Sequence, residues 1–383
     1  MRENRFLKGI VVFFALIGFL TLASLIWIFA TNANHLATLL SVVSLVKTQG
    51  LYEPDTEQMI VGATAGIVDS LHDPYSKYLD KATWEELRIR LEAKFGGIGV
   101  YVLEESRGKF KIISPIKGTP AYRKGVKNGD IILKINGESV QNMTQDEVVS
   151  LMRGDPGTQL LLTVFRESEG KEYEFKIIRE IINVPSVEYE VIDEVSKIGY
   201  ISLKQFHSHS AEEMADALDE LLRERKIKGL ILDLRYNGGG DFNAALSIAS
   251  LFLDKGKEIV SVSDGKGNEE IYESSGGNVD VPVVVLINQD SASAAEILAG
   301  ALKDNNRALL VGTTTFGKGL VQTVYPLRDG GALKLTTQKY FTPDGTDINE
   351  IGIHPDYEVK NGEDMNRDLQ MEKAVEVIKK QIF

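Results

Sequence analysis

Two runs in the second half of the chain, residues 229–234 and 281–287, are apolar at almost every position. A strand that buries one face alternates apolar and polar residues, so an unbroken apolar run is typical of a strand buried on both faces. From residue 198 onward, strand-like runs alternate with segments of helical periodicity. The pattern predicts an α/β core in which a mainly parallel sheet is flanked by helices.

Before this core the sequence contains a helical segment and then a β-rich domain. Apolar residues recur three and four positions apart between residues 34 and 94, which predicts helices. From residue 95 the period changes to two, and short β-branched runs alternate with turn pairs as far as residue 182. Within this domain residues 144–152 have helical periodicity, and Thr144 and Glu147 have the spacing of a capping box.

The whole chain is therefore predicted to be a multidomain α+β protein. We expect a cytoplasmic stub with a membrane anchor, a helical segment, a small β-domain, the α/β core and a C-terminal helix, with the boundaries 1–33, 34–94, 95–182, 183–361 and 362–383. At 383 residues, of which 43% are hydrophobic, the chain can bury more than one core.

The anchor is predicted from residues 9–30, which carry no charge and follow Arg2, Arg5 and Lys8. A helix of this length spans the hydrocarbon core of a bilayer, about 30 Å. A cleaved signal peptide is the alternative, but its apolar region runs for about 7–15 residues and ends in a small-x-small site. Residues 30–33, Ala-Thr-Asn-Ala, form a poor site of this kind. We expect an uncleaved anchor with a cytoplasmic N-terminus and an extracytoplasmic remainder.

The composition excludes several classes of protein. A formal net charge of −12 and the lack of a clustered basic run argue against nucleic acid as a partner. The sequence has no cysteine, which excludes disulfides, thiol catalysis and thiolate metal sites. The sequence His207-Ser-His209 is a candidate metal site, but no acidic or histidine partner stands at ligand spacing, and a helix start suits it better. We expect neither a metal nor a cofactor.

The strongest chemical signal lies at residues 291–296, Ser-Ala-Ser-Ala-Ala-Glu, which follow the second apolar run. Lys318, between two glycines, comes 25 residues after Ser293, and Gln322 follows four residues later. A serine, a lysine and a glutamine can act as nucleophile, base and orienter of the base. Two alternatives stay open at this point: Ser291 or Ser293 caps the following helix, and Lys318 is an ordinary surface charge.

This chemistry sets two conditions on the fold. A lysine acts as a base only when it is neutral, so burial or neighbouring cations must lower its pKa from about 10.4. In a strand, residues i and i+4 lie about 13 Å apart, so Gln322 meets Lys318 only if the chain bends between them. We expect this bend near Gly319.

A phosphate-binding loop is the rival interpretation of Lys318. Residues 312–318 match the pattern G-x-x-x-x-G-K and follow a strand-like run. Two features oppose nucleotide binding: Gly319 stands where Ser or Thr is needed to hold Mg²⁺, and residues 320–327 have the composition of a strand where a helix is required.

Several ordered motifs carry a resemblance to known families. Residues 95–100 (Phe-Gly-Gly-Ile-Gly-Val) and 125–132 resemble a PDZ domain in its bacterial, circularly permuted form. The segments that resemble the C-terminal processing, or tail-specific, peptidases are 233–240 (Asp-Leu-Arg-Tyr-Asn-Gly-Gly-Gly), the Ser-Ala-Ser-Ala stretch, 316–322, 340–345 and 352–356. The likeness covers the chain from about residue 36 to its end.

The resemblance implies roles for residues already singled out. Ser293 is the nucleophile, Lys318 the general base and Gln322 the residue that orients the lysine, while the oxyanion hole consists of the amides of Gly239 and Ala294. Ala294 opens a helix and Gly239 lies in a glycine cluster after a buried strand, so both positions suit amides that face an anion. Asp233 and Arg235 are expected to fix this loop by pairing with each other.

In the PDZ-like part, the expected mechanism is capture of a peptide carboxylate by loop amides and addition of the peptide as an extra strand. The candidate loop consists of Gly96, Gly97, Ile98 and Gly99. A plain turn is the alternative for this loop. Arg153 is a candidate sensor of peptide occupancy, and an ion pair with Asp155 or a neighbouring residue is the competing interpretation.

Taken together, the sequence predicts a membrane-anchored extracytoplasmic serine endopeptidase. Its partners would be proteins or peptides with free carboxyl termini, and the resemblance implies a homo-oligomer. A catalytically silent PDZ anchor and a nucleotide-binding protein are the alternatives.

Overall fold

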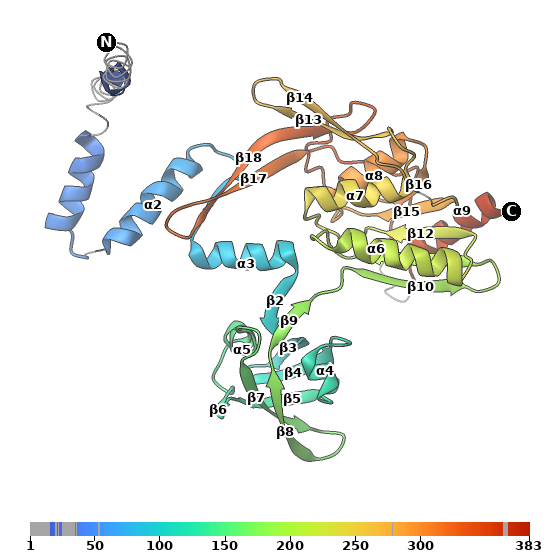
Figure 1. Cartoon of the computed structure of the whole chain (residues 1–383), viewed down its shortest axis with the longest axis horizontal. Helices are drawn as coiled ribbons and strands as arrows, with labels where there is room; N and C mark the ends of the chain where they lie inside the picture. Colours follow the sequence, from blue (N-terminus) through green and yellow to red (C-terminus); the bar gives the residue numbers. More distant parts are fainter. Residues whose placement is uncertain are drawn as a thin grey trace, which may run out of the picture. The chain divides into compact units, whose positions relative to one another are not determined.

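The computed structural model describes residues 16–19, 21, 23–24, 35, 37–52, 54–277, 279–362 and 367–383. Two compact units, Met1–His72 and Asp73–Phe383, are considered separately (Figure 1). Most of the predicted anchor, residues 9–30, lies outside the described residues. Among the residues that are described, no helix combines the length and apolar character needed to cross a membrane.

The first unit is helical in its described part. Residues 37–49 form one helix, and α2 (Thr56–Asp69) follows after a short connection. The prediction of helices for residues 34–94 is confirmed at 37–49, 56–69 and 81–92, but a short strand at 77–79 interrupts them. Leu39, Leu45 and Ile67 are exposed on these helices.

The second unit begins with β1 (Lys77–Leu79) and α3 (Lys81–Glu92). Asp80 caps α3 by accepting a hydrogen bond from the amide of Thr83 (2.8 Å), and Ala93 ends the helix in the left-handed conformation. The next strand, β2 (Lys94–Gly97), pairs with a strand more than 80 residues later.

A six-stranded antiparallel sheet forms the PDZ-like domain, with the order β3-β4-β5-β7-β8 and β6 beside β5. Its elements are β3 (Val100–Ser106), β4 (Lys109–Pro115), α4 (Pro120–Arg123), β5 (Asp130–Ile135), β6 (Glu138–Ser139, paired with β5), α5 (Gln145–Met152), β7 (Gln159–Arg166) and β8 (Lys171–Ile178). The capping box predicted at Thr144 and Glu147 is present at the start of α5. The chain then leaves through β9 (Glu180–Asn183), which pairs with β2.

The α/β core has a six-stranded sheet with the order β10-β11-β12-β15-β16-β19. Its strands are β10 (Val187–Asp193), β11 (Ile198–Leu203), β12 (Gly229–Asp233), β15 (Val283–Ile287), β16 (Ala308–Gly312) and β19 (Tyr357–Glu358). All neighbours are parallel except β10 and β11. The predicted parallel α/β core is confirmed.

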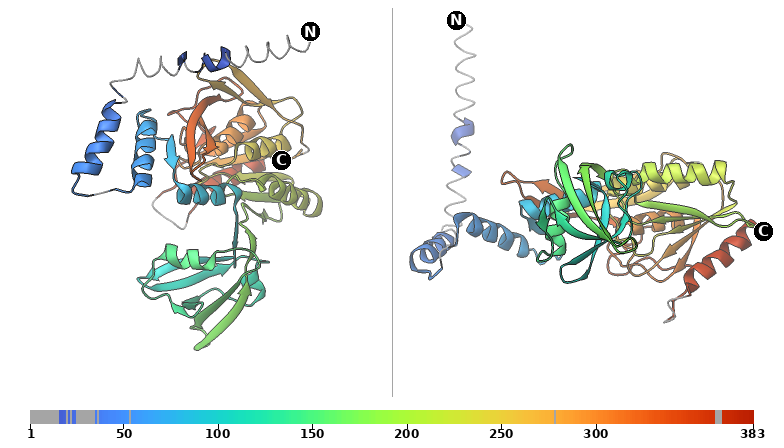
Figure 2. Two further views of the ribbon diagram at one scale, coloured as in Figure 1. Left: turned by 60° about the vertical axis from the view of Figure 1, so that its left-hand side comes forward. Right: turned by 90° about the horizontal axis from the view of Figure 1, so that it is seen from below.

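Helices cover both faces of this sheet, which explains the unbroken apolar runs. They are α6 (Ser210–Asp219, continued by the π-helical turn η1, Glu220–Glu224), α7 (Phe242–Phe252), α8 (Ala294–Asp304) and α9 (Leu369–Ile382). In β12, Leu230 and Leu232 pack on the side of α6, α7 and α8, whereas Ile231 packs with α9. Figure 2 (right) shows α9 in red on the opposite side of the sheet from α6.

A second, antiparallel sheet joins the start of the unit to its C-terminal half. It has the order β1-β18-β13-β14, with β17 paired to β18. These strands are β13 (Glu258–Asp264), β14 (Glu269–Glu273), β17 (Leu320–Pro326) and β18 (Ala332–Phe341). The strand predicted after Lys318 is confirmed as β17.

Candidate active site

Three neighbouring parallel strands end at the same edge of the core sheet. The glycine cluster of residues 237–240 follows β12, Ser293 follows β15, and Lys318 follows β16. Because the carboxyl ends of parallel strands meet at one edge, residues far apart in the sequence come together there.

The three predicted catalytic residues, Ser293, Lys318 and Gln322, line one cleft of about 570 Å³ at this edge together with the two predicted oxyanion-hole residues, Gly239 and Ala294. Leu87 and Leu91 of α3 line the same cleft. The site is thus formed by residues from the core together with a helix that precedes the PDZ-like domain.

Ser293 is the N-cap residue of α8 and has an unusual backbone conformation. Its φ and ψ angles are 56° and −117°. Such a conformation costs a non-glycine residue about 1–3 kcal/mol and is found mainly at functional sites. The interpretation of Ser291 as the helix cap is wrong, because the buried Ser291 hydroxyl instead donates to the carbonyl of Leu234 (2.8 Å) and accepts from the amide of Asn288 (3.0 Å).

The buried carboxylate of Glu296 joins the serine and lysine loops. Its Oε2 accepts from the amides of Ser293 (2.8 Å) and Lys318 (2.9 Å). Its Oε1 accepts from the Thr315 hydroxyl (2.6 Å) and the Gly317 amide (2.7 Å). Glu296 therefore fixes the backbone at both Ser293 and Lys318.

Sequence reasoning missed this role of Glu296. The available signal was its position three residues after Ser293, which is the spacing of a capping box. The three donors from residues 315, 317 and 318 become visible only once β15 and β16 are known to be neighbours.

The environment of Lys318 favours its neutral form. Burial, and then the positive charge of Lys334, lowers the pKa of Lys318, while the carboxylates of Glu296 and Asp73 act in the opposite direction. The Nζ atom lies 5.0 Å from the centre of the Tyr75 ring. In the described part of the chain no hydrogen bond joins the Ser293 hydroxyl to Lys318 Nζ.

Gln322 does not contact Lys318 through a hydrogen bond. Its Nε2 donates to the carbonyl of Leu320 (3.3 Å) and to the Thr336 hydroxyl (3.5 Å). The expected bend is not centred on Gly319: Gly317 has a φ of 85°, and the register of β17 against β18 shifts between Val321 and Gln322.

The two predicted oxyanion-hole residues are in close contact. A Cβ atom on Gly239 would lie 2.9 Å from both the Ala294 nitrogen and the Ser293 Cβ, and φ of Gly239 is 93°. Only glycine fits this position without displacement. The Gly239 amide donates to Asn237 Oδ1 (2.9 Å), whereas the Ala294 amide has no partner among the described residues. One of the two donors is thus free and the other is engaged.

The expected pairing of Asp233 with Arg235 is confirmed. The two side chains form an ion pair of 2.7 Å, and both are almost fully buried. Arg235 also pairs with Asp368 at 2.8 Å, which ties the glycine-cluster loop to the start of α9.

The phosphate-loop alternative is wrong, because β17 follows Lys318 where a helix is required. The amides of Gly317 and Lys318, which would face a phosphate, are bound to the Glu296 carboxylate.

The predicted peptide-binding residues are brought together only in part. Ile98, Gly99 and Arg153 line a cavity of about 300 Å³ with residues of β3 and α5. The prediction of one loop over residues 96–99 is wrong, since Gly96 and Gly97 pair with β9 as part of β2.

Arg153 makes no ion pair within the described residues, so the alternative of pairing with Asp155 is not found. Its guanidinium carbon lies 4.9 Å from the centre of the Phe95 ring, and its Nε is buried without a hydrogen-bond partner.

The interpretation of His207 and His209 as a plain helix start was incomplete. Helix α6 does begin at Ser210, with His209 as its N-cap residue. Glu213, however, approaches both imidazoles and supplies the acidic partner that the sequence reading did not find.

Models of known families match most of the chain. Peptidase family S41 matches residues 197–359, a PDZ domain matches 111–166, and the N-terminal domain of the activating protease CtpB matches 29–83. The carboxy-terminal-processing protease of Bartonella bacilliformis is 41% identical over 333 residues, which cover 85% of this chain and 75% of that protein. This chain belongs to the carboxy-terminal processing protease family.

Other members of the family agree with this assignment. The carboxy-terminal processing protease CtpA of Bacillus subtilis is 41% identical over 81% of this chain and 66% of its own length. A probable CtpA-like serine protease of Staphylococcus aureus is 38% identical over 85% of this chain and 65% of its own length. This chain thus spans about two thirds of the length of these two carboxy-terminal processing proteases.

Solved structures show the same fold. The photosystem II D1 C-terminal processing protease has a TM-score of 0.50 and 31% identity, covering 83% of this chain and 86% of that one. A putative S41 protease from Bacteroides fragilis has a TM-score of 0.52 and 17% identity over 88% and 97% of the two chains, which bears on the fold alone. The protein is a serine-type peptidase of multidomain α+β architecture with a PDZ domain.

Proposed function

We propose that this protease cleaves extracytoplasmic proteins near their carboxyl ends, with Ser293 as nucleophile and Lys318 as general base. The convergence of both residues with Gly239, Ala294 and Gln322 in one cleft is the observation that carries the proposal. The strained conformation of Ser293 and the lowered pKa of Lys318 support it further.

In the proposed mechanism the Ser293 oxygen attacks the peptide carbonyl while neutral Lys318 takes its proton. The resulting ammonium gives the proton to the leaving amine, and water then hydrolyses the acyl-enzyme by the same route. The free amide of Ala294 binds the oxyanion of the tetrahedral intermediate. No metal or cofactor takes part in these steps.

The resting arrangement requires a local change before the reaction. Lys318 must move to within hydrogen-bond distance of Ser293, and the Gly239 amide must exchange Asn237 Oδ1 for the oxyanion. Gln322 would hold Lys318 only after its side chain leaves the Leu320 carbonyl. Such tightening on substrate binding is common at catalytic sites.

For the PDZ domain we propose binding of the substrate carboxyl end in the cavity between β3 and α5. β3 is an edge strand of its sheet, so its free side can pair with an added peptide strand. Ile98 and Gly99 line the cavity just before β3. Their backbone amides are therefore placed to donate hydrogen bonds to a peptide carboxylate. Arg153, which follows α5 and lines the same cavity, is proposed to sense the bound peptide.

The mutational test uses a peptide with a free carboxyl terminus and a fluorogenic cleavage site. We expect Ser293→Ala and Lys318→Ala to abolish hydrolysis, whereas Lys360→Ala, at an exposed lysine, leaves it unchanged. Hydrolysis retained by both active-site variants would rule out the dyad. Peptide binding without hydrolysis by the wild type would instead support the silent PDZ anchor.

We further propose that residues 9–30 anchor the enzyme in the cell membrane with the catalytic part outside, and that it assembles as a homo-oligomer. The charge pattern of the first 30 residues supports the orientation. Protease added to intact cells should digest the catalytic part if the orientation is right. Light scattering that detects only monomers would contradict the assembly.

A further inference from the structure

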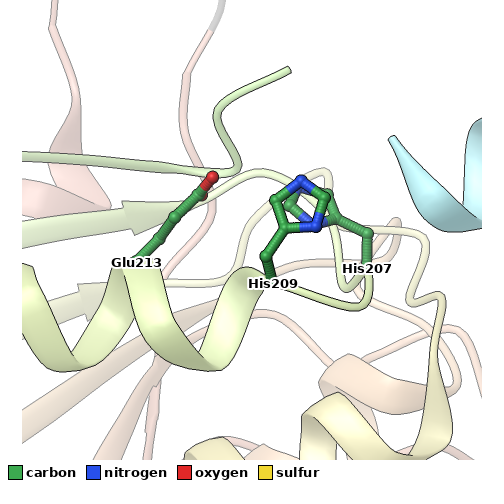
Figure 3. A group of neighbouring side chains, drawn as sticks. All are labelled: His207, His209 and Glu213. Carbon is green, nitrogen blue, oxygen red and sulfur yellow. The ribbon is translucent and has the colours of Figure 1, made fainter. Parts of the chain in front are cut away.

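A cluster of three potential metal ligands lies between β11 and the first turn of α6. It consists of His207, His209 and Glu213, whose ligand atoms all lie within 4.8 Å of one another (Figure 3). His209 and Glu213 are four residues apart, which places them on one face of the helix start. In Figure 3 the two imidazole rings overlap, their centres 4.2 Å apart, and the Glu213 side chain extends from α6 on the same side as that of His209.

The histidines have unused ligand capacity. His207 is 2% exposed, and neither of its ring nitrogens makes a hydrogen bond of regular geometry in the described part of the chain, although a backbone group of Val184 lies near the ring. The Nε2 atom of His209 is also buried and unpartnered, while its Nδ1 lies 3.1 Å from the Ser208 hydroxyl. Buried polar nitrogens normally have partners. A neutral imidazole has one ring nitrogen with a lone pair, so a metal ion that binds one nitrogen of each ring would supply a partner to both histidines.

Glu213 has the arrangement expected of an oriented metal ligand. All three of its hydrogen bonds reach Oε2, from the Ser186 amide (2.7 Å), the Ser186 hydroxyl (2.6 Å) and the Val187 amide (3.3 Å). Its Oε1 therefore keeps its lone pairs. Outer hydrogen bonds of this kind, like that of Ser208 to His209, fix the orientation of metal ligands.

We propose that His207, His209 and Glu213 bind a divalent transition-metal ion of the Zn²⁺ class. The ligand atoms are His209 Nε2, Glu213 Oε1 and one ring nitrogen of His207, and water takes the remaining position. Two imidazoles and a carboxylate suit Zn²⁺ or Co²⁺, whereas Mg²⁺ and Ca²⁺ prefer oxygen ligands alone. Ligand atoms around tetrahedral zinc are about 3.3 Å apart, so small side-chain rotations close the site.

The site is separate from the catalytic cleft but adjoins two segments that serve it. None of the three ligands lines the cleft. Phe206, next to His207, donates to the carbonyl of Gly239 (3.1 Å) and accepts from the amide of Asp241 (3.0 Å). Glu213 holds Ser186, which follows β9 at the exit from the PDZ domain. A bound ion would therefore stabilise both the glycine-cluster loop and the segment at Ser186. It would have no role in the proton transfers.

The test is calorimetric titration of the untagged, chelator-treated full chain with ZnCl₂. We expect one saturable site per chain, a rise in melting temperature with Zn²⁺ and none with Mg²⁺. Co²⁺ should give the visible absorption of a tetrahedral complex. His209→Gln and Glu213→Gln should each weaken Zn²⁺ binding at least about 10-fold. The control His72→Asn, at an exposed histidine in a left-handed conformation that asparagine tolerates, should bind as the wild type does.

His209→Gln is the decisive variant, because His209 is only partly buried and its melting temperature without metal reports whether the fold is intact. Unchanged Zn²⁺ affinity in folded His209→Gln would overturn the proposal. Failure of the wild type to bind Zn²⁺ in a saturable way would overturn it as well. Peptide hydrolysis is not used as a readout, so failure of the metal site leaves the proposed protease mechanism untouched.

Discussion

Glu296→Gln gives a sharp test of how the active site is held together. The buried carboxylate accepts four hydrogen bonds, two on each oxygen, from Ser293, Thr315, Gly317 and Lys318. An amide has one acceptor oxygen and an NH₂ group, so it cannot accept from four donors. If an NH₂ group replaces Oε1, the Thr315 hydroxyl can rotate and accept a hydrogen bond from it. The Gly317 amide cannot, because it is itself a donor and would face the NH₂ group without an acceptor.

The cost follows from these contacts. An unsatisfied buried amide costs about 1–3 kcal/mol, and each remaining bond loses about 1–1.5 kcal/mol when its acceptor loses its charge. With two such bonds to Ser293 and Lys318, the free energy of unfolding of the protease core should fall by about 3–6 kcal/mol. Misplacement of reacting groups by about 1 Å can cost about 100-fold in rate, so kcat/KM should fall at least about 100-fold.

Urea unfolding followed by circular dichroism measures the first effect, and hydrolysis of a fluorogenic peptide at a temperature where the variant is folded measures the second. The matched control is Glu376→Gln on the exposed side of α9, where the carboxylate pairs only with lysines, and both quantities should stay unchanged. A Glu296→Gln enzyme with wild-type stability and kcat/KM would refute the reasoning. Lower stability with wild-type kcat/KM would show that Glu296 stabilises the fold without positioning the catalytic groups.

Three further substitutions probe the same site. Lys334→Met removes a positive charge that lowers the pKa of Lys318, so this pKa should rise and the acidic limb of the pH profile of kcat/KM should move to higher pH. Gly239→Ala places a methyl group 2.9 Å from the Ser293 Cβ, and peptide hydrolysis should fall at least about 100-fold. Thr315→Val removes one donor to the buried carboxylate and should lower the free energy of unfolding by about 2–4 kcal/mol.

Each of these has its own control. Lys339→Met, at an exposed lysine of the same strand, should leave the pH profile in place, and an equal shift in both variants would contradict a specific effect of Lys334. Gly238→Ala has open space at its Cβ position and should be tolerated better than Gly239→Ala. Thr315→Ser keeps the hydroxyl and should retain most of the stability that Thr315→Val loses.

The fold was predictable from the sequence where a short run of residues indicates by its composition or spacing how it is buried or capped. The runs 229–234 and 281–287 had to be covered on both faces, and α9 and the group of α6, α7 and α8 cover them. The capping box at Thr144 is likewise complete within four residues. The pairing of Gly96 and Gly97 with β9 was not predictable in this way, because the partner strand lies more than 80 residues away and glycines carry no periodic signal.

In the candidate site, too, features that depend on neighbouring residues were predictable, and side-chain contacts between distant segments were not. Ser293, Lys318 and Gly239 each follow an apolar strand, so the rule for parallel strand ends was enough to bring them together. Side-chain partners were missed whenever they come from another loop. Glu296 has a local partner in Ser293, but its other donors belong to the loop after β16.

At Ser293 and Lys318 the backbone is held by hydrogen bonds, whereas the two side chains are not bonded to each other. The Glu296 carboxylate accepts hydrogen bonds from the backbone amides of Ser293 and Lys318 at 2.8 and 2.9 Å, while no hydrogen bond joins the Ser293 hydroxyl to the Lys318 amine. Because these backbones are fixed, we expect the proposed dyad to form by rotation about side-chain bonds, which is far faster than loop rearrangement. The glycine cluster differs, since its Gly239 amide is bound to Asn237 and its Gly239 carbonyl to Phe206. If the proposed roles hold, the slow part of activation should therefore lie in the glycine-cluster loop and not in the side chains of Ser293 and Lys318.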